Sequence, residues 1–123
     1  MPLKVIIVDD SIITVKKLIV LLEGLGHQVV ATAGTGIEAL EAYRAHKPDF
    51  LTMDITMPDM DGVQATASII SEYPDARIIM VTSHGQERMV IDSLEAGASG
   101  YVLKPVRIDK LSDMIAKVME RTA

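Results

Sequence analysis

The sequence contains no cysteine and no tryptophan, and it has only one phenylalanine and three tyrosines. The lack of cysteine excludes disulfide bonds and thiolate chemistry. The scarcity of aromatic side chains leaves no platform on which nucleic-acid bases would stack. The net charge of −5 argues against nucleic acid and against an anionic membrane as partners, because both attract basic surfaces.

Long hydrophobic runs are also missing. The first apolar run, residues 5–8, is too short for the core of a signal peptide, and Asp9 and Asp10 end it. No stretch approaches the length of a membrane span. We therefore expect a cytoplasmic protein without membrane insertion. The length of 123 residues fits a single domain over residues 1–123, and the 49% hydrophobic content is enough for a core.

Short segments rich in Val, Ile, Leu and Met recur along the chain, and several are apolar throughout, as in strands buried on both faces. The five segments that predict strands are residues 4–8, 28–32, 50–53, 77–81 and 101–103.

Helical patterns follow each of these strands. Within residues 12–25 the apolar positions recur every three or four residues, which is typical of a helix with one buried face. The other predicted helices cover about 37–47, from about 63 to just before Tyr73, from after Gln86 to Gly97, and about 108–121.

Five strands that each precede a helix predict an α/β domain with an open parallel sheet and helices on both faces. In such sheets ligands bind beyond the carboxyl ends of the strands. The residues at those ends are therefore the candidate site, and they are Asp9, Asp10, Asp54, Thr82, Ser83 and Lys104.

Capping roles are alternatives for several of these polar residues. Asp10 or Ser11 fits the cap of the first helix, and Ser83 fits the cap of the fourth. Asp59 and Asp61 suit turn and cap positions. Asp54 has no comparable alternative, because no helix begins directly after it.

Three carboxylates at one sheet edge repel one another, and a bound divalent cation removes that repulsion. Oxygen ligands from one or two carboxylates suit Mg²⁺. Lys104 adds a second positive charge, although taken alone it also fits an exposed lysine whose stem lies on the sheet edge. A carboxylate between Mg²⁺ and a lysine is suited to act as a nucleophile toward a phosphoryl group, with the Thr82 hydroxyl donating to a phosphoryl oxygen.

The chain resembles the receiver domains of two-component response regulators, and within them the single-domain chemotaxis regulators of the CheY type. The motifs that carry the resemblance are Val8-Asp9-Asp10, Met53-Asp54, Met57-Pro58, Asp61-Gly62, Val81-Thr82 and the run from Gly97 to Lys104-Pro105. The resemblance implies a flavodoxin-like (βα)5 fold with strand order 2-1-3-4-5.

The resemblance also implies roles for individual residues. Asp54 corresponds to the phosphoacceptor, and Asp10 to the direct Mg²⁺ ligand, with Asp9 acting mostly through water. The backbone carbonyl of Thr56 completes the metal site. Lys104 pairs with the phosphoryl group and usually precedes a cis peptide bond.

Further roles concern the response to phosphorylation. Thr82 corresponds to the switch hydroxyl, and Tyr101 to the aromatic residue that changes rotamer with it. Both act on the partner-binding face formed by the fourth helix, fifth strand and fifth helix. Thr56 and His84 occupy the positions that tune the lifetime of the aspartyl phosphate, although His84 also fits a purely solvent-facing role.

We therefore expect a switch that takes a phosphoryl group from a histidine kinase or phosphotransfer domain and acts through protein contact, as a monomer or a phosphorylation-dependent dimer. It would not be an enzyme beyond its own phosphotransfer and dephosphorylation. The flagellar motor switch is one candidate target; a phosphorelay or phosphate-sink role is an alternative.

Three other classes fit less well. A phosphoaspartate hydrolase usually has a second acid where this chain has Thr56. A flavin mononucleotide module would not place Asp9 and Asp10 in its phosphate loop. A binding module that is never phosphorylated would not need the complete set of acids, hydroxyl and lysine.

Overall fold

Strands and helices alternate in the computed structural model, which describes residues 2–120. The strands are β1 (Lys4–Val8), β2 (Gln28–Ala33), β3 (Phe50–Asp54), β4 (Ile78–Thr82) and β5 (Gly100–Leu103). The helices are α1 (Ile12–Gly24), α2 (Gly36–His46), α3 (Gly62–Glu72), α4 (Glu87–Glu95) and α5 (Ile108–Glu120).

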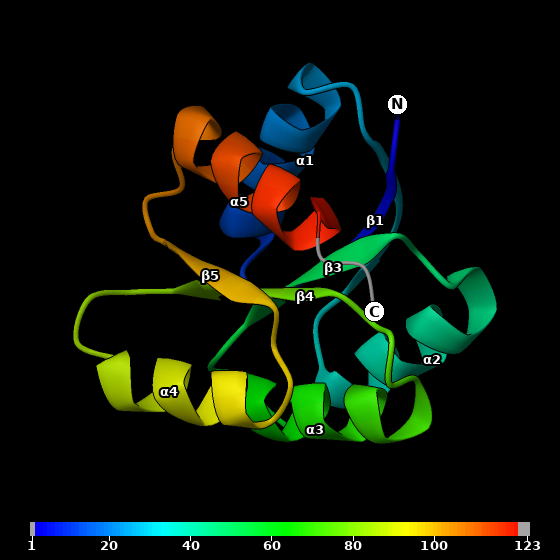
Figure 1. The fold of residues 1–123 in the computed structure, drawn as a ribbon, viewed down its shortest axis with the longest axis vertical. Helices are drawn as coiled ribbons and strands as arrows, with labels where there is room; N and C mark the ends of the chain where they lie inside the picture. Colours follow the sequence, from blue (N-terminus) through cyan, green and yellow to red (C-terminus); the bar gives the residue numbers. More distant parts are fainter. Residues whose placement is uncertain (1, 121–123) are drawn as a thin grey trace.

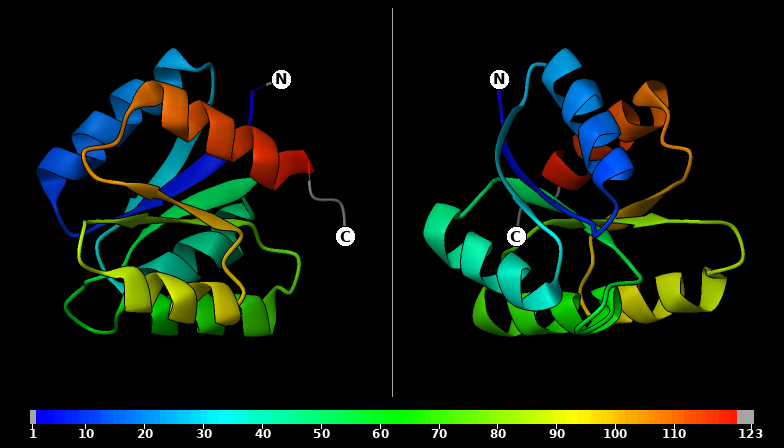
Figure 2. Two further views of the ribbon diagram at one scale, coloured as in Figure 1. Left: turned by 60° about the vertical axis from the view of Figure 1, so that its left-hand side comes forward. Right: turned by 180° about the vertical axis from the view of Figure 1, so that it is seen from behind.

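The described strands form one parallel sheet in the order β2-β1-β3-β4-β5. Helices α1 and α5 cover one face of this sheet, and α2, α3 and α4 cover the other (Figures 1 and 2). The predicted open α/β fold and the strand order implied by the resemblance are both confirmed.

Element boundaries differ from the predicted ones by one or two residues. Helix α4 ends at Glu95 rather than at Gly97, and Gly97 has a positive φ of 114°, which a helix does not contain. Strand β3 continues to Asp54, one residue beyond its predicted end. The predicted last residue of the fifth helix, Arg121, lies outside the described residues.

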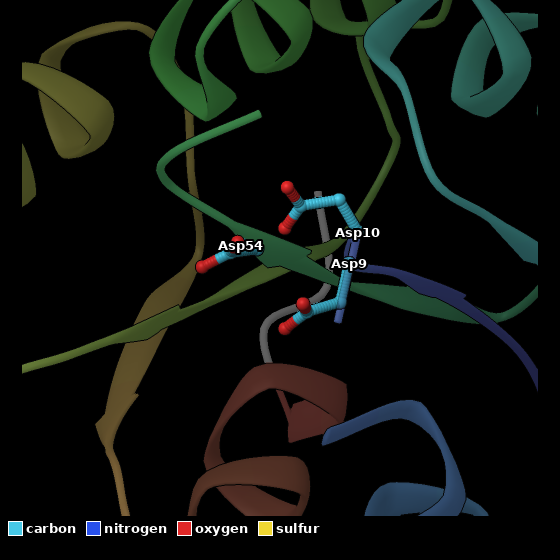
Figure 3. Close-up of side chains that lie close together, drawn as sticks. All are labelled: Asp9, Asp10 and Asp54. Atoms are coloured by element: carbon cyan, nitrogen blue, oxygen red, sulfur yellow. The ribbon is translucent and has the colours of Figure 1, made fainter. Parts of the chain in front are cut away.

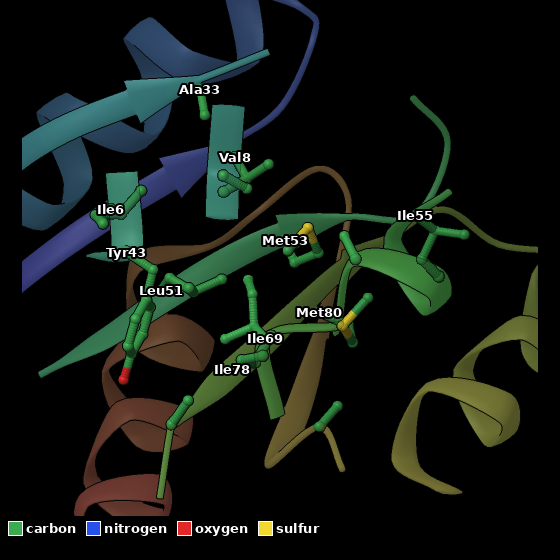
Figure 4. Close-up of a cluster of buried hydrophobic side chains, with 14 of the residues drawn as sticks. Ile6, Val8, Ala33, Tyr43, Leu51, Met53, Ile55, Ile69, Ile78 and Met80 are labelled. Carbon is green, nitrogen blue, oxygen red and sulfur yellow. The ribbon is translucent and has the colours of Figure 1, made fainter. Parts of the chain in front are cut away.

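Two apolar clusters hold the helices on the sheet, because alternate residues of each strand face opposite sides. Ile6, Leu51 and Met53 face α2, α3 and α4, where Tyr43 and Ile69 pack against them (Figure 4). The second cluster packs α1 and α5 on the other face, through Val5, Ile7, Phe50, Ile79, Leu18, Leu22, Leu111 and Ile115. Strands β3 and β4 are buried along their whole length, which places their carboxyl ends on a rigid support.

The caps of α1, α2 and α3 come from Ser11, Thr35 and Asp61. Asp61 caps α3 in a complete capping box with Gln64. Thr35 caps α2, but the Glu38 carboxylate accepts from the Gly34 N–H instead of the Thr35 N–H. Of the two alternatives for α1, Ser11 is the cap.

One buried hydroxyl in the sheet lacks a hydrogen-bond partner among the described residues. Thr52 lies in the middle of β3, is fully buried, and its Oγ1 has no partner. A buried hydroxyl without a partner is unfavourable. We expect Thr52→Val, which has the same shape, to raise the free energy of unfolding by about 1 kcal/mol, measured by urea denaturation.

Thr66→Val is the matched control for this substitution. The Thr66 hydroxyl is equally buried but lies 3.5 Å from Met80 Sδ, to which it donates. We expect no gain in stability from Thr66→Val. An equal gain in both variants would show that hydrophobicity, rather than the missing partner of Thr52, causes the effect.

Candidate functional site

Three carboxylates lie together at the carboxyl ends of two paired strands. Asp9 and Asp10 directly follow β1, and Asp54 is the last residue of β3; the pairing of Val8 with Met53 brings them together. Each offers a carboxylate oxygen within 4.8 Å of the others. Figure 3 shows the side chains of Asp9 and Asp10 extending from the end of β1 toward Asp54.

Lys104 places one ammonium group against two of these acids. Its Nζ lies 3.2 Å from Asp54 Oδ1 and 3.3 Å from Asp9 Oδ2. It follows β5, its backbone N–H donates to the Thr82 carbonyl at 2.7 Å, and its peptide bond to Pro105 is cis, as the resemblance implies. The sheet therefore brings together Asp9, Asp54 and Lys104 from three separate strand ends.

The charges at this edge are not balanced, since three carboxylates face one ammonium. Burial raises the pKa of Asp54, and the neighbouring charge of Asp9 raises it further, while Lys104 acts in the opposite direction. Burial lowers the pKa of Lys104, but attraction to Asp54 and Asp9 outweighs this, and the pKa of Lys104 is raised overall. Lys104 is therefore charged at neutral pH. Because three carboxylates face this one ammonium, a further positive charge would be favourable at the site.

The donor set also fits a divalent cation. Asp9 is 3% exposed and Asp54 is 8% exposed, while Asp10 lies at the surface. Asp9 Oδ1 accepts from the Ser11 N–H, whereas Asp9 Oδ2 has no hydrogen-bond partner among residues 2–120 and lies 3.3 Å from the Lys104 ammonium. Buried carboxylate oxygens with unused lone pairs beside an exposed carboxylate are suitable ligands for Mg²⁺.

Thr82 ends β4, the strand beside β3, and is 1% exposed. Its hydroxyl donates to Gln86 Oε1 at 2.9 Å and lies 3.4 Å from the Ser83 carbonyl. No hydrogen bond joins it to the three acids among the described contacts. The predicted hydroxyl is thus at the right strand end, and in this state it is bonded to a glutamine.

Ser83 does not cap α4, so that prediction is wrong. The helix begins at Glu87 with Gln86 in the capping position, and the Gln86 side chain makes no capping hydrogen bond. Instead, the Gln86 amide oxygen accepts from the Ser83 N–H at 2.9 Å.

The remaining predicted residues surround the site. Thr56 is exposed two residues beyond Asp54, and its Oγ1 accepts from Gln86 Nε2 at 3.4 Å. Tyr101 is 42% exposed on β5 and lines a cavity of about 310 Å³ together with His84. His84 is exposed in the loop before α4. The structure gives their positions, and their predicted roles in switching and phosphate lifetime stay predictions.

Two functional contacts were missed by the sequence analysis. Gln86 bridges Thr82, Ser83 and Thr56. Asp59, expected in a local turn or cap, accepts from the N–H groups of Gly36 and Ile37 at the start of α2. The contacts of Gln86 with Thr56 and of Asp59 with Gly36 join residues 30 and 23 positions apart, so no local pattern would reveal them.

Residues 5–116 match the response regulator receiver domain family. The chain is 41% identical over 116 residues to the chemotaxis protein CheY of Bacillus subtilis, covering 94% of this chain and 97% of that protein. A solved complex of CheX, CheY, BeF₃ and Mg²⁺ from Borrelia burgdorferi contains a similar chain with a TM-score of 0.90 and 38% identity, over 96% of this chain and 90% of that one. The response regulator domain of Thermotoga maritima CheB matches with a TM-score of 0.90 and 30% identity over the full length of both chains.

Proposed function

This chain belongs to the response regulator receiver domain family, and on that basis we propose that it is a signalling switch controlled by phosphorylation of Asp54. The observation that carries the proposal is the group of three carboxylates with a single ammonium, Lys104, at the carboxyl edge of the sheet. These four side chains come from three strand ends, and the Thr82 hydroxyl at the end of β4 adds a fourth.

The phosphoryl transfer needs little covalent chemistry from the protein. A carboxylate oxygen of Asp54 forms the new bond to phosphorus while the bond from phosphorus to the donor histidine nitrogen breaks. Lys104, already 3.2 Å from Asp54 Oδ1, pairs with the negative charge of the phosphoryl oxygens. The later attack of water on phosphorus restores the carboxylate, so the chain acts on its own phosphoryl group and is not a separate enzyme.

Asp9, Asp10, Asp54 and the Thr56 carbonyl would hold Mg²⁺. When bound, the ion neutralises charge on the carboxylates and on the transferred group. Burial and the neighbouring charge of Asp9 raise the pKa of Asp54, and such a positive charge would act in the opposite direction. Asp54 then remains ionised and available as a nucleophile.

The response to phosphorylation passes through Thr82 and Tyr101. We propose that the Thr82 hydroxyl moves to a phosphoryl oxygen, and that Tyr101 changes its position in the adjoining cavity. This biases a two-state equilibrium of the face formed by α4, β5 and α5, where a partner binds. Thr56 and His84, on either side of the site, would set the lifetime of the phosphorylated state.

The partners follow from the same proposal. The phosphoryl donor is a histidine kinase or phosphotransfer domain, and the target is a protein, with the flagellar motor switch as one candidate. A phosphorelay or phosphate-sink role is the alternative. Within residues 2–120, every helix is too short or too polar to cross a bilayer.

Intact mass measured after incubation with acetyl phosphate tests the proposal. We expect wild type to gain one phosphoryl group in the presence of Mg²⁺. The gain should be lost with EDTA, because the carboxylates then lack their counter-ion, and lost in Asp54→Asn, because the nucleophile is absent. Asp75→Asn, an exposed acid away from the site, should behave as wild type.

A folded wild-type protein that gains no mass with Mg²⁺ would contradict self-catalysed phosphorylation. A gain that persists in Asp54→Asn would place the phosphoacceptor elsewhere.

A further inference from the structure

Gln86 bridges the two loops that follow β3 and β4. Its Oε1 accepts from the Thr82 hydroxyl and from the Ser83 N–H, both at 2.9 Å. At the other end of the same amide, Nε2 donates to Thr56 Oγ1 at 3.4 Å. One side chain thus contacts a residue next to the phosphoacceptor strand and the hydroxyl expected to bind the phosphoryl group.

This arrangement is not explained by helix capping. Gln86 occupies the capping position of α4, yet its side chain makes no capping hydrogen bond to that helix. The preceding residue, Gly85, has a positive φ of 92°, and this conformation turns the chain so that Gln86 reaches back to β4. The local backbone therefore directs the amide toward Thr82 and leaves the start of α4 uncapped.

Thr82 has a single hydroxyl hydrogen to donate. It is 1% exposed, so water competes little for that hydrogen. The hydrogen given to Gln86 Oε1 is not available to a phosphoryl oxygen on Asp54. The two acceptors therefore exclude each other.

We propose that Gln86 is a positioning residue that holds the Thr82 hydroxyl in the unphosphorylated state and releases it to the phosphoryl group. This inference rests on the proposed function, since it assumes that Asp54 is phosphorylated. When Thr82 turns to the phosphoryl group, Gln86 Oε1 loses its hydrogen bond to the Thr82 hydroxyl. Gln86 and Tyr101 both line the same cavity. The hydrogen-bond exchange at Thr82 thereby reaches the start of α4 and the partner-binding face.

The test is a titration of the whole chain with beryllofluoride, a phosphoryl mimic, in the presence of Mg²⁺. Gln86→Leu removes the nearer acceptor with little change in volume and leaves only the longer contact to the Ser83 carbonyl at 3.4 Å. We therefore expect beryllofluoride to bind about five-fold more tightly, the factor of one ordinary hydrogen bond. Gln86→Glu keeps an acceptor at the same place, so its affinity should not rise above that of wild type.

Gln64→Leu is the matched control, because Gln64 also belongs to a loop-to-helix junction beside the site but hydrogen-bonds to Asp61. It should leave the affinity unchanged. The decisive comparison uses Thr82→Val, which has no hydroxyl to hold. In that background Gln86→Leu should have no effect on affinity.

Hydrogen exchange gives a readout that needs no phosphoryl mimic. The Ser83 amide should exchange faster in Gln86→Leu than in wild type, and Gln86→Glu should restore its protection.

Three results would overturn the inference. The first is an unchanged affinity in Gln86→Leu, and the second is an equal gain with and without the Thr82 hydroxyl. Both would leave the phosphorylation switch intact, because wild type still binds the mimic. The third is a folded wild type that binds no beryllofluoride with Mg²⁺, which would remove the proposed function together with the inference.

Discussion

Asp54→Asn is expected to stabilise the protein while it removes the phosphoacceptor. Burial and the charge of Asp9 raise the pKa of Asp54 and outweigh the attraction of Lys104, so the ionised side chain opposes folding. The neutral amide avoids this penalty. In EDTA at neutral pH we expect the variant to be about 1 kcal/mol more stable than wild type by urea denaturation.

The pH dependence of this difference has a definite sign. The folded-state pKa of Asp54 is raised, so the wild-type carboxyl contributes stability below its unfolded value of 3.8 and loses that contribution as the pH rises through the folded-state value. The advantage of Asp54→Asn should therefore be small in acid and grow toward neutral pH.

In Mg²⁺ we expect wild type to be more stable than Asp54→Asn. A cation that binds the folded state stabilises it, and the variant offers that cation one carboxylate fewer. Asp75→Asn, which removes an exposed charge, should lie within about 0.5 kcal/mol of wild type in both conditions. A less stable Asp54→Asn in EDTA would show that the pairing of Asp54 with Lys104 outweighs burial.

The fold was predictable because its signals are local and repeated. Strand β4 has four consecutive apolar residues before Thr82, and the helix stripe around Leu18 and Leu22 has a helical period. The edge strand β5 is less regular: Gly100 has no side chain to signal a strand, and the strand begins one residue earlier than predicted. The order of the strands came from the resemblance, because the sequence of one strand does not indicate which strands pair with it in the sheet.

The site residues at the strand ends could be predicted from the sequence, whereas the contacts between the loops could not. Asp54 stood out because it directly follows an apolar run and no helix begins there for it to cap. Lys104 indicated a site only together with the acids at the other strand ends. Gln86 and Asp59 carry no such signal, since each bonds to a loop about 20 to 30 residues away. Contacts of this kind depend on how two loops approach one another, which the sequence of either loop alone does not state.

Gly62→Ala is expected to be the most damaging single substitution that we describe. Gly62 opens α3 and lies directly against the end of β3. An added methyl group would collide with the Asp54 carbonyl oxygen and lie 2.9 Å from the Ile55 Cα. Both obstacles are backbone, one at the end of the fully buried strand β3 and one in the buried residue that follows it, so neither moves aside easily. We expect a loss of about 3 kcal/mol in the free energy of unfolding, measured by urea denaturation.

Gly24→Ala separates this collision from the general effect of adding a methyl group to a helical glycine. Gly24 ends α1, and the nearest atom to an added methyl group is Ile108 Cδ1 at 4.0 Å, an ordinary contact. Because alanine favours helix over glycine, this variant should be as stable as wild type or up to about 1 kcal/mol more stable. A Gly62→Ala protein as stable as Gly24→Ala would mean that the backbone after Asp54 shifts to fit the methyl group at little cost in stability. If instead the loop resists, as the buried strand beneath it implies, any residual folded Gly62→Ala should also gain phosphoryl groups from acetyl phosphate more slowly, because the displaced backbone carries the nucleophile.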